Sequence, residues 1–406
     1  MQNPLTEALL KRIRSRTGSD DTPVPAVAAE IFPVDSASLS VREAQFSDFE
    51  SIHSMNSRLG QGADSEENWN RLWRDNPAIR ETHAKARIGW VLEDAGKITG
   101  FLGSIQLAYR FQGQVVSAAA TCRFAVEPSY RGFTHMLVNS FFRQKDVDLF
   151  LNTTATVGAG KMMAALRASP VPQTDYGRVL FWVLQPTKFT EAVLRRAGIH
   201  RGVSRFGGIA GSFAIGGDIA LRGRKPKKIS KRFEIRNLSL DEVGADFSVF
   251  WQERASQAEY LFAQRSPEVL AWHFNAPGTR KKTNVLAAYT GSKLEGYTIL
   301  RHEPEKEYLR RSVIADLMTA TDDPELITSL LSTAHDSSRE FGSHVLELLG
   351  YPRKIREAGL LARPYWRDYP ACPYYFKARD RALQQRLQNE SAWYACPYDG
   401  DTTLWP

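Results

Sequence analysis

The residues best suited to chemistry follow an apolar strand in the first half of the sequence. Residues 122–137 read CRFAVEPSYRGFTHML. The apolar stretch ends at Val126, and Pro128 ends the strand because proline has no N–H to donate to a sheet. Arg131 and Gly132 then open a helix, and the first amides of a helix have no partner within it. These amides, the helix dipole and the guanidinium of Arg131 together predict a phosphate or pyrophosphate site.

The same segment resembles the pyrophosphate loop of the GNAT family of acyl-CoA-dependent N-acyltransferases. Val126-x-Pro128-x-Tyr130-Arg131-Gly132 matches the first part of the family pattern V-x-P-x-Y-R-G-x-G-x-G. The resemblance implies that loop amides hold the pyrophosphate of coenzyme A and that the preceding strand exposes backbone groups to the pantetheine arm. It implies coenzyme A contacts along the strand end, the loop, the helix start and one later strand end: Phe124, Ala125, Val126, Arg131, Gly132, Phe133, Thr134, His135 and Asn152. A plain turn residue at a strand end is the alternative role of Asn152.

Two positions depart from the family pattern. Thr134 and Met136 stand where the family has its second and third glycines. A β-carbon at these positions crowds a phosphate or shifts the turn. Two interpretations therefore stay open: a working coenzyme A site, and a degenerate copy that keeps the strand–turn–helix shape without the ligand.

Acyl transfer from a thioester to an amine requires a group that removes a proton from the amine. Glu127, just past the strand end, is one candidate base, and a solvated turn carboxylate is its alternative role. Asp316 lies inside an apolar strand, where a carboxylate needs a partner or a function, so a catalytic role and an arginine partner explain it equally well. Tyr130 is a candidate proton donor, with packing as the alternative.

The sequence near the C-terminus combines aromatic and acidic residues, since residues 393–401 read WYACPYDGD. This mixture suits a sugar or amine site, and an aromatic clamp that holds the segment to the body is the alternative. The eight histidines show no metal-ligand spacing such as HExxH, so no metal is expected. The sequence contains neither a GxSxG elbow nor a GxxxxGK[ST] loop.

The elements that position these residues occur twice. Residues 41–44 and 233–236 read as strands that each lead into a helix, and Pro77 and Pro277 end two similar peptides 200 positions apart. A hairpin, a further strand, a helix and another strand follow in each copy. The order β-α-β-β-β-α-β is also that of the GNAT family. We therefore predict an α/β (α+β) fold with two tandem GNAT-like domains, each a mixed, mostly antiparallel sheet flanked by helices.

Four segments follow from this pattern: a flexible or helical extension over 1–38, a first GNAT-like domain over 39–215, a basic linker over 216–232, and a second domain over 233–406 with the aromatic and acidic tail. Three carboxylates surround the equivalent helix start of the second copy: Asp322, Asp323 and Glu325. Because they repel a pyrophosphate, we expect only the first copy to bind coenzyme A.

The composition fits a globular protein, with 43% hydrophobic and 24% charged residues among 406. No run approaches the ~18 apolar residues of a membrane span, and no secretory signal is evident. Three cysteines without CxxC spacing favour a reducing compartment, so a cytoplasmic location is expected. The net charge is +8, with seven basic residues and no acid between positions 222 and 232. Without aromatic residues to stack on bases, this run favours a solvated linker over nucleic-acid binding.

The expected activity is transfer of an acyl group from acetyl-CoA or another acyl-CoA to an amine. Tandem GNAT proteins are similar to acyltransferases of cell-surface polysaccharide pathways, so the resemblance implies a small-molecule or saccharide amine as acceptor. Two alternatives stay open: a non-catalytic binding or scaffold protein, and a Fem-type transferase that uses aminoacyl-tRNA. The acceptor, the acyl length and the oligomeric state are not predicted.

Overall fold

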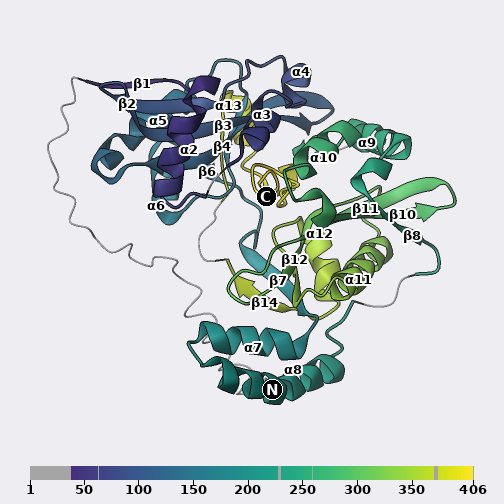
Figure 1. The fold of residues 1–406 in the computed structure, drawn as a ribbon. Helices are drawn as coiled ribbons and strands as arrows, with labels where there is room; N and C mark the ends of the chain where they lie inside the picture. Colours follow the sequence, from purple (N-terminus) through teal and green to yellow (C-terminus); the bar gives the residue numbers. More distant parts are fainter. Residues whose placement is uncertain (1–37, 63, 227–229, 258, 370–373, 406) are drawn as a thin grey trace.

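The computed structural model describes residues 38–405 apart from residues 63, 227–229, 258 and 370–373 (Figure 1). The helix expected near the N-terminus lies outside these described residues. Within them, the chain forms two sheets flanked by helices, which confirms the predicted fold class. No helix of the described residues combines the length and apolar composition needed to cross a membrane.

The first sheet contains the strands of the first copy. Its order is β1-β2-β3-β4-β5-β15-β6, and β9 pairs with β3. The β4–β5 pair is parallel, whereas the other pairs are antiparallel. The strands are β1 (Leu39–Glu43), β2 (Gly89–Asp94), β3 (Lys97–Phe111), β4 (Gln114–Val126), β5 (Leu149–Asn152), β6 (Ser169–Pro170), β9 (Phe262–Ala263) and β15 (Tyr375–Ala378).

The second sheet contains the strands of the second copy. Its order is β14-β7-β13-β12-β11-β10-β8, with β12 and β13 parallel and the other pairs antiparallel. The strands are β7 (Arg178–Val183), β8 (Glu234–Leu238), β10 (Thr283–Thr290), β11 (Lys293–His302), β12 (Arg311–Thr319), β13 (Val345–Leu348) and β14 (Tyr365–Asp368).

The helices follow the same order in both copies, which confirms the predicted duplication. In the first copy these are α2 (Phe49–Arg58), α3 (Glu66–Trp73), α4 (Ala78–Thr82), α5 (Thr134–Phe142) and α6 (Val157–Ala165). Between the copies lie α7 (Pro186–Arg196) and α8 (Arg201–Arg222). The second copy has α9 (Ala245–Gln257), α10 (Pro267–Phe274), α11 (Pro324–Glu340), α12 (Arg353–Leu360) and α13 (Arg381–Arg386). At the start of α11, Asp323 accepts a hydrogen bond from the Glu325 amide (2.8 Å), as expected of an N-cap residue.

Besides the short β9 of the second copy, which pairs with β3, two strands pair with the sheet of the other copy. β7 follows the first copy in sequence but pairs with β13 and β14 of the second sheet. β15 follows the second copy but pairs with β5 and β6 of the first sheet. Sheet membership therefore crosses the sequence boundary near residues 216–232, and each sheet is completed by a strand from the other half of the chain.

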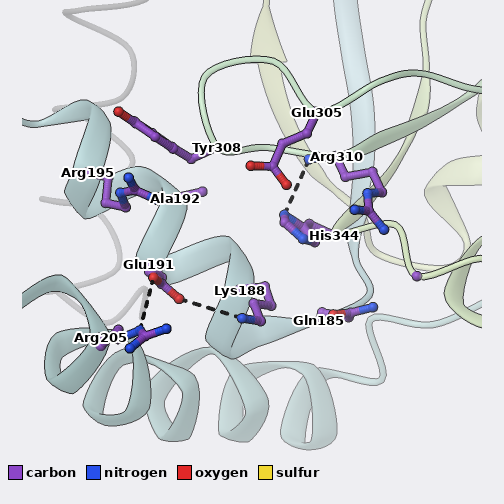
Figure 2. A pocket seen from close by; sticks show the side chains of 11 residues that line it. Gln185, Lys188, Glu191, Ala192, Arg195, Arg205, Glu305, Tyr308, Arg310 and His344 are labelled. Atoms are coloured by element: carbon purple, nitrogen blue, oxygen red, sulfur yellow. Dashed lines mark hydrogen bonds and ion pairs between the residues drawn. The ribbon is translucent and has the colours of Figure 1, made fainter. Parts of the chain in front are cut away.

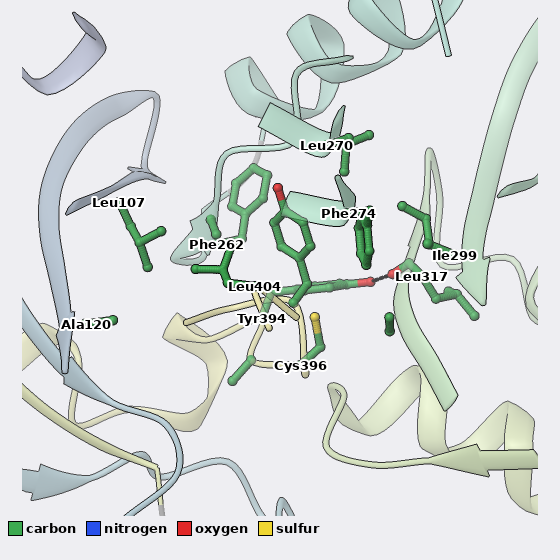
Figure 3. Close-up of a cluster of buried hydrophobic side chains, with 14 of the residues drawn as sticks. Leu107, Ala120, Phe262, Leu270, Phe274, Ile299, Leu317, Tyr394, Cys396 and Leu404 are labelled. Atoms are coloured by element: carbon green, nitrogen blue, oxygen red, sulfur yellow. Dashed lines mark hydrogen bonds between the residues drawn. The ribbon is translucent and has the colours of Figure 1, made fainter. Parts of the chain in front are cut away.

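The aromatic tail packs between the two sheets. One hydrophobic core cluster includes Leu107 of the first sheet, Ile299 of the second sheet and Tyr394 of the tail (Figure 3). The Tyr394 hydroxyl donates a hydrogen bond to the Leu317 carbonyl, and the Tyr398 hydroxyl donates to the Gln264 carbonyl (2.7 Å). The tail thus joins both sheets through apolar burial and through hydrogen bonds to their backbones.

Candidate functional site

The first sheet opens between its two parallel strands. β5 pairs with β4 only from Ala118 to Ala120, whereas β4 continues to Val126. The register of β3 against β4 also shifts between Phe101 and Gly103, and Arg123 of β4 has a left-handed φ of 47°. Beyond Ala120, β4 keeps a hydrogen-bonded neighbour on the β3 side, whereas its pairing with β5 ends and β5 itself stops at Asn152. The end of this pairing leaves backbone groups on one edge of β4 without a strand partner.

The segment after β4 is a 3-10 helix over Pro128–Phe133 that continues into α5. The Tyr130 amide donates to the Glu127 carbonyl (2.9 Å), and the Thr134 amide donates to the Arg131 carbonyl. The Thr134 hydroxyl also donates to the Arg131 carbonyl (2.9 Å). The prediction of a row of amides without partners is therefore wrong at Tyr130 and Thr134, because both amides donate to carbonyls of the same segment. The reason is that Thr134 has helical dihedrals (φ −53°, ψ −32°), so the chain coils where the family pattern has flexible glycines.

Arg131 lies on the exposed surface of this 3-10 helix. Within the described part of the chain, its guanidinium makes no ion pair or hydrogen bond, so its charge is available to an anion. The neighbouring His135 is exposed, and its Nδ1 lies 3.1 Å from the Gly132 carbonyl oxygen. Phe124 and Phe133 are partly buried against the core beneath α5.

The remaining predicted coenzyme A residues lie at two strand ends. Ala125 and Val126 are buried at the end of β4. Asn152 ends β5, pairs with Tyr375 of β15, and its side-chain oxygen accepts a hydrogen bond from the Thr154 amide (3.3 Å). The structure thus gathers the predicted residues along β4, its following helix and the end of β5.

Two candidate catalytic residues near the loop already have partners. Glu127 forms ion pairs with Arg58 (2.9 Å) and Lys97 (3.4 Å). The Tyr130 hydroxyl donates to an Asp94 carboxylate oxygen (2.7 Å), and this hydrogen bond raises the pKa of Tyr130. A tyrosine with a raised pKa releases its proton less readily, and the carboxylate of Glu127 is already engaged by two cations.

The third candidate, Asp316, lies in the other sheet. It is fully buried in β12, and Nε of Arg265 contacts its two carboxylate oxygens at 3.1 and 3.0 Å. The Tyr297 hydroxyl donates to the same carboxylate (2.9 Å), and Arg265 also reaches Asp399 of the tail (3.4 Å). Asp316 therefore has an arginine partner, which was one of the two explanations that the sequence offered for it. It lies in the second sheet, whereas the loop after β4 belongs to the first.

A carboxylate that the sequence analysis did not single out lies at the opening of the first sheet. Asp401 of the tail accepts a hydrogen bond from the Thr153 hydroxyl (2.8 Å), and Thr153 directly follows β5. The indole nitrogen of Trp405 lies 3.3 Å from the other oxygen, and the Arg123 guanidinium stacks on that indole at 4.1 Å. Burial raises the pKa of Asp401, while its two hydrogen bonds and Arg123 lower it by less. Only the aromatic and acidic composition of residues 393–401 signalled this position.

A separate cavity of about 380 Å³ lies beside α7 and none of the predicted site residues line it (Figure 2). Its charged lining includes Lys188 and Arg205, which both approach Glu191 (3.9 and 4.0 Å). Within the described residues, no group of three or more histidine, cysteine, aspartate or glutamate side chains has the geometry of a metal site.

Comparisons with known proteins find similarity at the level of the fold. No family profile matches the sequence, and no curated protein matches it. Solved structures match by fold. A GCN5-related N-acetyltransferase from Anabaena variabilis has a TM-score of 0.53 at 11% identity, over 84% of this chain and 73% of that one. A probable N-acyltransferase of unknown function from Enterococcus faecalis has a TM-score of 0.54 at 10% identity, over 87% and 74%.

N-myristoyltransferase from Saccharomyces cerevisiae, solved with bound myristoyl-CoA, has a TM-score of 0.52 at 13% identity, over 86% of this chain and 81% of that one. At these identities the matches establish the fold alone. The match over most of both chains, with two sheets in the order of two GNAT repeats, agrees with the duplicated sequence. The chain has the tandem fold of the GNAT N-acyltransferases.

Proposed function

We propose that the protein transfers an acyl group from acyl-CoA to an amine, with coenzyme A bound along β4, the following 3-10 helix and α5. The observation that carries the proposal is the edge of β4 that has no β5 partner beyond Ala120, together with the exposed guanidinium of Arg131 on the helix that follows β4. The fold is shared with an enzyme solved with myristoyl-CoA, which supports an acyl-CoA as the donor. The acceptor class remains the amine of a small molecule or saccharide.

In this proposal each part of the site has one role. Arg131 contacts a phosphate of coenzyme A as a charge-assisted donor. The edge of β4 beyond Ala120 offers backbone hydrogen bonds to the pantetheine arm and to the thioester oxygen. The amine nitrogen attacks the thioester carbon, the carbon–sulfur bond breaks, and the amine loses a proton while the thiolate gains one. No covalent intermediate with the protein is needed when the two substrates are held together.

Asp401 is the proposed proton acceptor. It lies at the end of β5 through its hydrogen bond to Thr153, and within the described residues it has no direct ion pair. Burial raises the pKa of Asp401, and a carboxylate with a raised pKa is a stronger base. Glu127, Tyr130 and Asp316 stay weaker candidates because each is held by the partners described above.

Substitution of Arg131, the proposed phosphate contact, tests the coenzyme A site. Arg131→Ala is expected to weaken coenzyme A binding by about 1.5–3 kcal/mol, the loss of one charge-assisted contact, which corresponds to roughly ten- to 150-fold in Kd. Isothermal titration calorimetry with coenzyme A measures this change. Arg143→Ala is the matched control because Arg143 is an exposed arginine at the opposite end of α5. No binding by the unaltered protein, or equal losses in both variants, contradicts the proposed site.

A non-catalytic binding or scaffold protein is the second candidate. It is favoured by the internal hydrogen bonds of the Tyr130 and Thr134 amides and by the tail residues packed at the end of β5. Incubation with a panel of acyl-CoA donors and amines, followed by detection of the released thiol, separates the two functions. Thiol release that depends on the amine supports the transferase, whereas binding without release supports the scaffold.

A further inference from the structure

The long helix α8 presents an apolar face to solvent along its whole length. Phe206 is 79% exposed, Phe213 is 78% exposed and Leu221 is 89% exposed. Val203 and Ile209 are also more than half exposed on this face. The spacing of these residues places them on one side of a helix of 3.6 residues per turn, and 22 residues make that side about 33 Å long. Large side chains exposed together in this way mark an interaction surface.

The opposite face of α8 is built to pack on α7. A β-carbon on Gly207 would lie 2.6 Å from Leu194, and one on Gly211 would lie 2.4 Å from Thr190. Ile215 is buried in the core cluster that joins the two helices to the second sheet. Small residues on its inner face hold α8 to the body, whereas the large apolar residues on its outer face stay exposed to solvent.

The charge around this face is positive. Residues 186–222 contain six arginine and lysine residues and two acidic residues. The one acid of α8, Asp218, is turned inward, where it accepts from Arg224 (2.6 Å) and from the Tyr365 hydroxyl (2.7 Å) and pairs with Arg222 (2.7 Å). Arg205 is exposed at the edge of the apolar face. The basic run of residues 222–232 follows directly in sequence, and its seven cations outnumber the acids that pair with them among the described residues, Asp218, Asp336, Asp323 and Glu325. An apolar helix face bordered by basic residues is typical of helices that lie in the surface of a membrane.

We propose that α8 docks the protein on an anionic lipid surface, with the Phe206–Phe213 face inserted among the lipids and the basic residues against the headgroups. Charge favours a lipid surface over two other occupants of this face, a second copy of the chain and the N-terminal segment of residues 1–16. A second copy would bring one basic border against another, and residues 1–16 carry four basic residues and one acidic residue. Anionic headgroups neutralise such a border, because each basic residue near the surface is attracted to them. The proposal goes beyond the acyltransferase function and does not depend on it.

Co-sedimentation of the full chain with lipid vesicles tests this proposal. The protein is expected to sediment with phosphatidylcholine vesicles that contain phosphatidylglycerol, and much less with phosphatidylcholine alone. Phe206→Ser/Phe213→Ser is expected to reduce partitioning by at least about tenfold, because two phenyl rings no longer enter the lipid. Phe206→Ser alone is expected to have an intermediate effect. Val249→Ser is the matched control, since Val249 is 56% exposed on α9.

Each other outcome overturns the proposal. A full chain that stays in the supernatant with anionic vesicles excludes the lipid surface. Equal sedimentation of the double variant excludes α8 as the contact, and equal binding to neutral vesicles excludes the role of charge. If light scattering shows a stable dimer that the double variant dissociates, a second copy covers the face. The exposed positions leave the unfolding midpoint unchanged, and thermal unfolding of each variant checks this.

Discussion

Two buried aspartates in this molecule have opposite electrostatic surroundings. Asp316 is contacted by Arg265 and by the Tyr297 hydroxyl, so its charge is compensated within the core. Asp401 has the Thr153 hydroxyl and the Trp405 indole as hydrogen-bond donors, and burial raises its pKa. A buried carboxylate with few compensating partners costs stability when it is charged, which is why such residues are common at functional sites.

Asp401→Asn tests this cost at the residue scale. The folded pKa of Asp401 is raised, so its contribution to stability is present at acid pH and is lost as the pH rises through that pKa. Asparagine keeps the acceptor for Thr153 and carries no charge. We therefore expect the variant to gain free energy of unfolding relative to the unaltered protein as the pH rises from 4 to 8, measured by urea denaturation.

The same substitution tests the proposed base. Removal of a general base is expected to lower kcat by about a hundredfold or more once an acceptor amine is identified. Asp316→Asn is the comparison variant. Asp316 lies in the second sheet and pairs with Arg265, so this substitution is expected to destabilise the fold rather than to remove the base. If Asp401→Asn keeps full turnover, Asp401 is not the base.

At the scale of elements, glycines set the distance between α7 and α8. Gly208 and Gly211 lie against the backbone and side chains of Thr187, Thr190 and Glu191. Gly216 and Gly217 on the same helix have no atom within 4 Å of an added β-carbon. Glycine usually weakens a helix, so the retained glycines at Gly208 and Gly211 reflect the close approach of the two helices.

Gly211→Ala and Gly217→Ala form a matched pair that tests this packing. The added methyl group at position 211 meets Thr190 at 2.4 Å, so the helices must move apart, at a cost of about 1–3 kcal/mol. At position 217 the methyl group meets open space, and alanine is expected to stabilise the helix by about 0.5–1 kcal/mol. Urea denaturation followed by circular dichroism measures both. Equal effects would show that the close contact does not hold the helix pair.

At the scale of the whole molecule, the two sheets depend on each other. β7 comes before the basic stretch in sequence but lies between β13 and β14, whereas β15 comes after it and pairs with β5. The tail then fills the core between the sheets. A chain cut near residues 216–232 would deprive β5 of its neighbour β15, leave it only the short pairing with β4, and expose the buried side chains of β7, such as Phe181 and Trp182.

The intact chain is therefore expected to unfold in one cooperative transition. Tryptophan fluorescence and circular dichroism are expected to give the same midpoint in guanidinium chloride. A fragment of residues 39–230, which lacks β15 and the tail, is expected to show no cooperative transition. A fragment that folds by itself would instead support the domain boundaries predicted from the sequence. The exchanged strands would then not be needed for the first domain to fold.

Local chemistry determined much of this fold. The sequence alone predicted the features that depend on residues only a few positions apart. These are the two hairpins with their turns, the strand end at Pro128 and the helix cap at Asp323. The repeated order then specified two sheets, and the structure has both. The motif around Arg131 likewise predicted a strand followed by a helix, although its missing glycines close the loop into a 3-10 helix.

Contacts between distant residues were decided by the tertiary structure alone. Asp401 meets Thr153 across 248 positions of sequence, and Arg265 meets Asp316 across 51. The exchange of β7 and β15 likewise left no local pattern, since each strand pairs with strands that are remote from it in sequence. Such pairings depend on how the two sheets pack against the tail. The free energy gained by this burial depends on all the packed segments together and cannot be assigned to any one of them.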